Sequence, residues 1–283
     1  MASRSSVHNA QRYLGLELAG AKNQKTALAA LEFYPQEQKI FLLDIFEKIM
    51  KHEDQTSDEA LLDLVAEFKP ITAELTTRVP MGVNVPLDLP PCIGCTRKTC
   101  PLPQKCTVPT VKWMRETAKK AQKKKEFTPY TQRPVELWIR HHVLPELPAA
   151  HAFEIDETLG GNKGPLTARM HFLKRHLHGI RLLETWPKLT ISVLGFELGL
   201  SKRTLSSYRK LEEGAYAREE ILETLVHQKG VFIYERDIQK LSHSLACFDA
   251  FICAYTALLA DTHQCAKTPK ASLGSWVHYP RLC

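Results

Sequence analysis

Four cysteines within one short stretch constrain this 283-residue chain more than any other feature. Cys92 and Cys95 form a CxxC pair, and Cys100 and Cys106 follow after short, uneven gaps. Four thiolates complete the coordination shell of a zinc ion or of an iron–sulfur cluster. Because Gly94 and the neighbouring prolines keep the chain turning, we expect the four sulfurs to converge on one metal centre.

The sequence leaves the identity of this metal open. Structural zinc sites commonly use two CxxC pairs with a longer spacer, so a single pair with short gaps favours a 4Fe–4S cluster over zinc. The plainer interpretation is a set of redox or disulfide cysteines. The other cysteines of the chain are scattered, at Cys247, Cys253, Cys265 and Cys283. Clustering therefore favours a metal-binding insertion over a disulfide framework.

The charge of the chain indicates a class of partner. The net charge is +7, which favours phosphate-rich partners, although solvated basic helices are common in proteins that never bind nucleic acid. A lysine-rich helix is predicted after the cysteines, and a basic, hydroxyl-rich stretch follows near residue 200. The residues expected to contact nucleic acid are Arg115, Lys119, Lys120, Lys123, Lys124, Lys202 and Arg203.

Targeting signals are not evident in the sequence. Residues 1–11 are polar and lack the apolar segment of a secretory signal. No apolar run reaches the roughly 18–20 residues that a membrane span needs. We therefore expect a cytoplasmic protein that does not bind membranes, and the sequence does not predict its oligomeric state.

Apolar runs in the first third of the chain predict the start of an α/β fold. The runs Tyr13–Ala19, Thr26–Phe33 and Ile40–Phe46 are closely spaced, which is typical of an antiparallel three-strand meander. A helix is predicted to begin after the N-cap Ser57, and a fourth strand over Val79–Leu87.

The remainder of the chain predicts helices around one further strand. Gly179–Glu184 reads as a strand, and helices are expected over residues 166–177, 191–198, 215–227 and 238–259. This order is consistent with a mixed sheet covered by helices. We expect residues 1–89 and 166–283 to form the two parts of the core. Residues 90–165 would then form an insertion with the cysteine loop, the basic helix and a Pro-rich stretch.

Several short motifs, taken in order, resemble one family. They are Gly15–Gly20 (GLELAG), Val83–Pro90 (VNVPLDLP), Leu183–Pro187 (LETWP), Phe248–Ala257 (FDAFICAYTA) and the terminal Gly274–Pro280 (GSWVHYP). Together they are similar to the motifs of domain-of-unknown-function family 429, a group of predicted nucleases with an RNase H-like fold. The resemblance extends over nearly the whole chain.

The resemblance implies a phosphodiesterase site that uses magnesium or manganese. Carried over by position, its catalytic residues would be Glu17, Asn84, Glu184 and Asp249. The family motif has Asp where this chain has Glu17 and Asn84, so the second position has lost its charge. Asp88 would lie on the same face as Asn84 if the strand stays extended, and could replace it as a metal ligand.

Three functional hypotheses follow. The first is a metal-dependent nuclease that uses Glu17, Glu184 and Asp249. The second is a catalytically impaired protein that binds nucleic acid through the cysteine centre and the basic helix. The third is a redox or metal sensor that uses the same centre.

Overall fold

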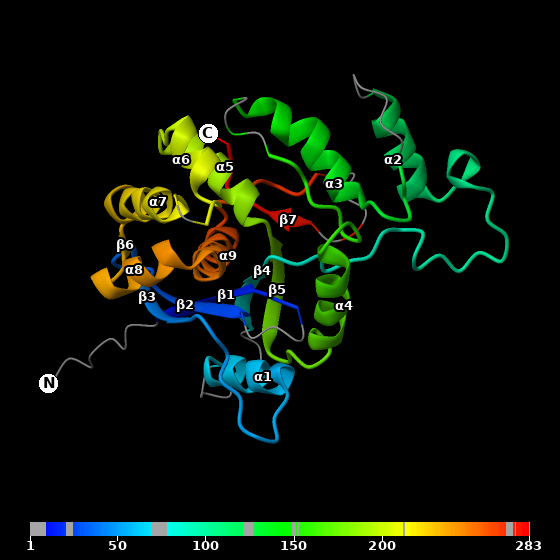
Figure 1. Cartoon of the computed structure of the whole chain (residues 1–283). Coiled ribbons are helices and arrows are strands. Elements are labelled where there is room, and N and C mark those ends of the chain that lie inside the picture. Colours follow the sequence, from blue (N-terminus) through cyan, green and yellow to red (C-terminus); the bar gives the residue numbers. More distant parts are fainter. Residues whose placement is uncertain are drawn as a thin grey trace, which may run out of the picture.

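A computed structural model describes residues 10–20, 25–69, 78–120, 127–148, 151, 153–211, 213–269, 274 and 276–282. The described residues form a seven-stranded mixed sheet with helices on both faces (Figure 1). The strand order is β6-β3-β2-β1-β4-β5-β7. The predicted α/β class is therefore confirmed.

The first three strands form the predicted antiparallel meander. They are β1 (Gln11–Glu17), β2 (Ala27–Tyr34) and β3 (Lys39–Phe46). The strands β4 (Val79–Val83), β5 (Ile180–Thr185) and β7 (Val277–His278) continue the sheet in parallel from β1, and β6 (Val231–Phe232) pairs in parallel with β3. The carboxyl ends of β1, β4 and β5 consequently meet at one edge of the sheet.

The helices of the described residues pack on both faces of the sheet. The bounds are α1 (Ser57–Glu67), α2 (Pro109–Lys120), α3 (Pro134–Trp138), α4 (Lys163–Leu173), α5 (Pro187–Glu197), α6 (Lys202–Ser207), α7 (Gly214–Lys229), α8 (Glu235–His243) and α9 (Leu245–Asp261). Short 3-10 turns cover Pro103–Lys105 and Leu144–Glu146, and a π-helical turn covers Ile139–Val143.

Strand alternation decides which side chains meet which helices. On β1, Tyr13 packs in one core with α7 and α9, whereas Leu14 and Leu16 pack in a second core with α1 and α4. Side chains that alternate along a strand point to opposite faces. Glu17 is therefore on the α9 face.

Helix α9 lies unusually close to the sheet. A methyl group built on Gly15 of β1 would overlap the Ala250 oxygen and the Ala254 nitrogen of α9, and one on Gly82 of β4 would overlap the Cys253 oxygen. These two glycines let the helix backbone rest directly on the strands, which brings the side chains of α9 to the carboxyl ends of β1 and β4.

Several sequence predictions need correction in detail. The single helix expected over residues 238–259 is two helices, α8 and α9, that meet at 113°. Ser244 causes the break, since its side chain accepts a hydrogen bond from Cys247 N and caps α9. Helix α1 is capped one residue earlier than expected, by Thr56, in a capping box with Glu59.

The cysteine segment and the helices after it have a small core of their own. The residues Cys106, Val111, Met114, Phe127 and Leu137 form this cluster, apart from the two cores of the sheet. Figure 1 shows α2 at the periphery of the molecule, with α3 between it and the rest of the fold. Among the described residues, no single helix has the length and hydropathy of a membrane span, and only the bent pair α8 and α9 reaches both together.

Candidate functional site

Two of the expected site residues meet at the carboxyl edge of the sheet. Glu17 ends β1 and Asn84 directly follows β4, the parallel neighbour of β1. The Asn84 Nδ2 donates a hydrogen bond of 2.8 Å to Glu17 Oε2, and the Asn84 backbone N–H donates to the Leu16 carbonyl. Asn84 thus holds the Glu17 carboxylate in place.

Asp249 approaches the same point from α9. Burial, followed by the charge of Asp249, raises the pKa of Glu17 to about 7. Burial also raises the pKa of Asp249. Lys163, at the start of α4, opposes both shifts, and its Nζ donates to the Asn84 carbonyl oxygen at 3.2 Å. The two carboxyl groups form an acidic pair that basic side chains compensate only in part.

Arg209 partners Asp249 in an open arrangement. One nitrogen, Nη1, donates to both carboxylate oxygens at 3.1 and 2.9 Å. The Arg209 side chain is 33% exposed, whereas that of Asp249 is 2% exposed. The Arg209 guanidinium also lies 5.7 Å from the centroid of the Tyr208 ring, so it contacts both Tyr208 and Asp249.

Glu184 is not brought to this pair. In β5, Leu183 packs in the α9 core and Leu182 against the α1–α4 core, so Glu184 continues on the α1–α4 face. Thr185 takes the α9 face instead, where its hydroxyl contacts the Cys253 thiol.

The Glu184 carboxylate is also fully bonded. Arg133 donates from Nη1 and Nη2 at 2.8 and 2.6 Å, Leu87 N donates at 2.9 Å, and the Trp186 indole donates at 3.0 Å. Arg133 is itself buried and donates further to Glu136, which also accepts from Thr158. Such a network holds both partners in a fixed geometry, away from the pair of Glu17 and Asp249.

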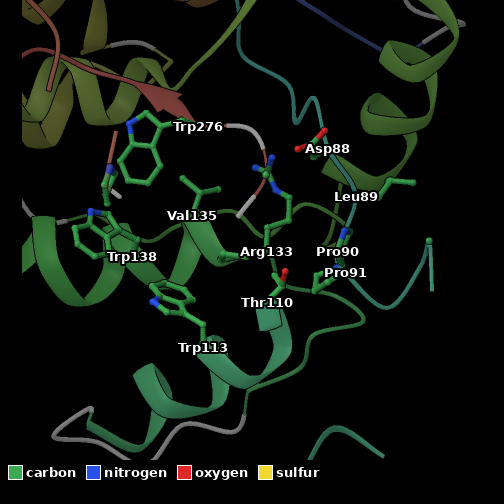
Figure 2. Close-up of a pocket in the computed structure, with 14 residues that line it drawn as sticks. Asp88, Leu89, Pro90, Pro91, Thr110, Trp113, Arg133, Val135, Trp138 and Trp276 are labelled. Atoms are coloured by element: carbon green, nitrogen blue, oxygen red, sulfur yellow. The ribbon is translucent and has the colours of Figure 1, made fainter. Parts of the chain in front are cut away.

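Asp88 lies elsewhere again. Strand β4 ends at Val83, so the extended geometry that would align Asp88 with Asn84 is absent. Asp88 instead lines a pocket of about 290 Å³, together with Arg133 and three tryptophans, Trp113, Trp138 and Trp276 (Figure 2). No sequence signal joins the tryptophans, because they come from α2, α3 and the segment before β7.

The cysteine loop gathers its four thiols without ligand geometry. The pKa of Cys92 is raised by burial and then by Cys106, Cys95 and Cys100, so the other three lie within electrostatic range. All four are free thiols. Within the described ranges, however, no group of three or more His, Cys, Asp or Glu side chains is arranged to hold a metal ion, either here or at the carboxyl edge.

The basic residues predicted to bind nucleic acid divide into different roles. Arg115 donates three hydrogen bonds, to the carbonyl oxygens of Pro103, Gln104 and Cys106, and so pins the cysteine loop to α2. Lys119, Lys202 and Arg203 are exposed. The side chain of Lys120 and the residues Lys123 and Lys124 lie outside what the structure describes.

Comparisons with known proteins give no further assignment. No family model, no curated protein and no solved structure matches the chain.

Proposed function

We propose that this protein is a divalent-metal-dependent phosphodiesterase with an RNase H-like core. The strand order β3-β2-β1-β4-β5, with an antiparallel first half and a parallel second half, supports that fold. The helix α9, which delivers an acidic residue to the end of β1, supports it too.

The single observation that carries the proposal is the pairing of Glu17 with Asp249. Two buried carboxylates that repel each other destabilise a fold unless a cation or a proton offsets their charge. Burial beside Asp249 raises the pKa of Glu17 to about 7, far above the usual range of a carboxyl group. Strongly shifted carboxyl groups of this kind concentrate at functional sites.

The donor set fits a hard divalent cation in part. Glu17 and Asp249 supply carboxylate oxygens, which magnesium and manganese prefer, while Asn84 orients Glu17. When bound, such a cation would polarise a phosphate and favour attack by water. Lys163 and the partly exposed Arg209 would hold the phosphate charge beside the carboxylates. Glu184, bonded to Arg133, has no part in this chemistry.

Cleavage assays test the proposal directly. Labelled single- and double-stranded DNA and RNA are incubated with manganese or magnesium, and the wild type is compared with Glu17→Gln and Asp249→Asn. We expect each variant to lose cleavage by at least about 100-fold. Glu223→Gln, an exposed carboxylate on α7, is the matched control and should cleave normally. Cleavage that survives in both site variants would refute the assignment.

A thermal-shift titration supplies a readout independent of activity. Manganese should raise the melting temperature of the wild type and not that of Glu17→Gln, because a ligand stabilises only the protein that binds it. An equal shift in both proteins would show that the cation binds elsewhere.

A second candidate is a protein that binds nucleic acid without cleaving it. The specific observation is that two of the four expected positions carry no available carboxylate: Asn84 is neutral, and Arg133 saturates Glu184. Binding with a steep salt dependence, no cleavage and no manganese shift would favour this candidate.

For the cysteine loop, we propose a structural metal centre with zinc or a 4Fe–4S cluster. The donor chemistry of four neighbouring thiols and the three hydrogen bonds from Arg115 support it. Such a centre would fix α2 relative to α3.

A further inference from the structure

The pocket beside Arg133 has walls of an unusual kind. Trp113 and Trp138 have ring centroids 6.4 Å apart and nearly parallel planes, and Trp276 meets Trp138 edge-on at 6.1 Å. Figure 2 shows these rings and Val135 around the hollow, with Asp88 and the Arg133 guanidinium towards one side. Flat apolar walls of this kind favour a flat ligand, since stacking on an aromatic face needs a planar partner.

The size of the pocket limits the ligand. Its volume of about 290 Å³ is just below the roughly 300–1,000 Å³ typical of small-molecule sites. One planar ring system fits such a volume, whereas a whole dinucleotide is too large for it.

The polar groups of the pocket suit an uncharged ring better than a phosphate. The Arg133 guanidinium lines the wall, but its hydrogen bonds go to Glu184 and Glu136. Asp88 contributes a negative charge to the wall, which disfavours an anionic ligand.

Cationic side chains lie outside the pocket, along α2. Lys112 and Lys119 are exposed on the same helix as Trp113. Within the described residues, the ion pair of Lys112 is a long, exposed one of 4.0 Å with Glu116, which screens its charge only weakly. Aromatic rings beside solvated lysines are the combination that binds the bases and the backbone of single strands.

We infer that this pocket holds one nucleobase of a single-stranded nucleic acid, with the adjacent phosphates on the lysines of α2. The inference rests on the proposed function and specifies its substrate class. A base in a duplex is stacked and cannot enter a pocket without being unpaired, so single strands are the favoured substrate. The segment from Asn84 to Asp88 joins the pocket to the Glu17–Asp249 pair.

Binding without cleavage is the test. The affinity of full-length protein for a fluorescent 12-nucleotide strand is measured without added divalent cation, for the wild type, Trp113→Leu and Tyr216→Leu. Tyr216 is an exposed aromatic residue on α7, 80% accessible, and serves as the control. We expect Trp113→Leu to weaken binding by roughly five- to a hundredfold, the range for loss of one stacked base, and Tyr216→Leu to leave it unchanged.

The same strand with abasic positions separates base binding from phosphate binding. Wild type and Trp113→Leu should bind it equally, because it offers no ring to stack. The inference would be overturned if Trp113→Leu lost the same affinity for the normal and the abasic strand, or if it lost no affinity for the normal strand. Quenching of wild-type tryptophan fluorescence by free nucleoside monophosphates checks the pocket without any substitution, and absence of quenching would also overturn it.

The outcomes distinguish this inference from the proposed function. A tryptophan-dependent preference for strands with bases, in a protein that cleaves nothing, would support the pocket and reject the phosphodiesterase. Cleavage that requires Glu17 and Asp249 but not Trp113, with no quenching of tryptophan fluorescence by nucleotides, would support the phosphodiesterase and reject the base pocket.

Discussion

The Arg133 guanidinium compensates the charge of two buried carboxylates, those of Glu184 and Glu136. It is 2% exposed and holds Glu184 and Glu136 together, each of them buried. Removing one partner of a buried ion pair leaves the other charge without compensation, which costs about 3–5 kcal/mol. In this chain two carboxylates depend on one cation.

Arg133→Met is therefore expected to lower the free energy of unfolding by about 3–5 kcal/mol, measured by urea denaturation. Arg12→Met is the matched control. Arg12 pairs with Glu32 at 3.1 Å, the distance between Arg133 and Glu136, but its side chain is 41% exposed. Its loss should cost less than about 1 kcal/mol. Equal effects of the two substitutions would contradict the anchoring role of Arg133.

Glu17 predicts a pH dependence of stability. Its pKa in the folded protein, about 7, is above the ordinary 4.5, so the folded state binds the proton more tightly. The stabilisation is present below about pH 4.5 and is lost as the pH rises to about 7. The free energy of unfolding of the wild type should fall by about 2–3 kcal/mol more than that of Glu17→Gln between pH 5 and pH 8. Parallel pH profiles would show that Glu17 is not perturbed.

The sequence identifies the acidic residues better than their partners. Glu17 and Asp249 stand out because each is an acidic residue within an apolar segment. Arg133 and Arg209 do not, since their partners are 51 and 40 residues away and no periodicity connects them. The face that Glu184 occupies depends on strand register, which a short motif does not report.

At the scale of elements, the contact of α9 with the sheet positions Asp249. Gly15 and Gly82 leave no room for a side chain beneath this helix. A methyl group at either position would lift α9 away from the strands and carry Asp249 away from Glu17.

Gly15→Ala is expected to lower the free energy of unfolding by about 1–3 kcal/mol or more, the usual cost of overpacking, and to reduce cleavage in the assays above. Gly20→Ala is the control, because a methyl group there meets nothing within 4 Å. Thermal denaturation of both variants measures the difference. Retention of wild-type stability by Gly15→Ala would show that α9 adjusts without cost.

Local patterns explain which elements the sequence predicts well. The meander and the helix α1 follow from periodicity and capping within a few residues of each other. Strands β6 and β7 are two residues long, too short for any alternation to appear. The break between α8 and α9 is marked only by Ser244, within a stretch that is helical on both sides.

At the scale of the whole molecule, the cysteine loop and α2 form a unit with its own small core. Loss of a metal centre should therefore destabilise this unit more than it destabilises the sheet. Metal analysis of purified protein should give about one zinc or four iron atoms per chain. After chelation, amides of residues 90–120 should exchange faster with solvent, while those of α9 stay protected.

Cys100→Ser provides the control for chelation, since it removes one of the four thiols. Its amides in residues 90–120 should exchange rapidly before any chelator is added and show no further change. If the wild type contains no metal and its exchange ignores the chelator, the structural-centre proposal fails.

The separation between Arg133 and Glu184 also sets the order in which a newly made chain can mature. During synthesis, Arg133 leaves the ribosome 51 residues before the carboxylate that it binds. Of the two carboxylates that pair with Arg133 in the described structure, only that of Glu136 is present until β5 emerges. The tryptophan pocket is likewise incomplete until Trp276, which directly precedes β7, has been made.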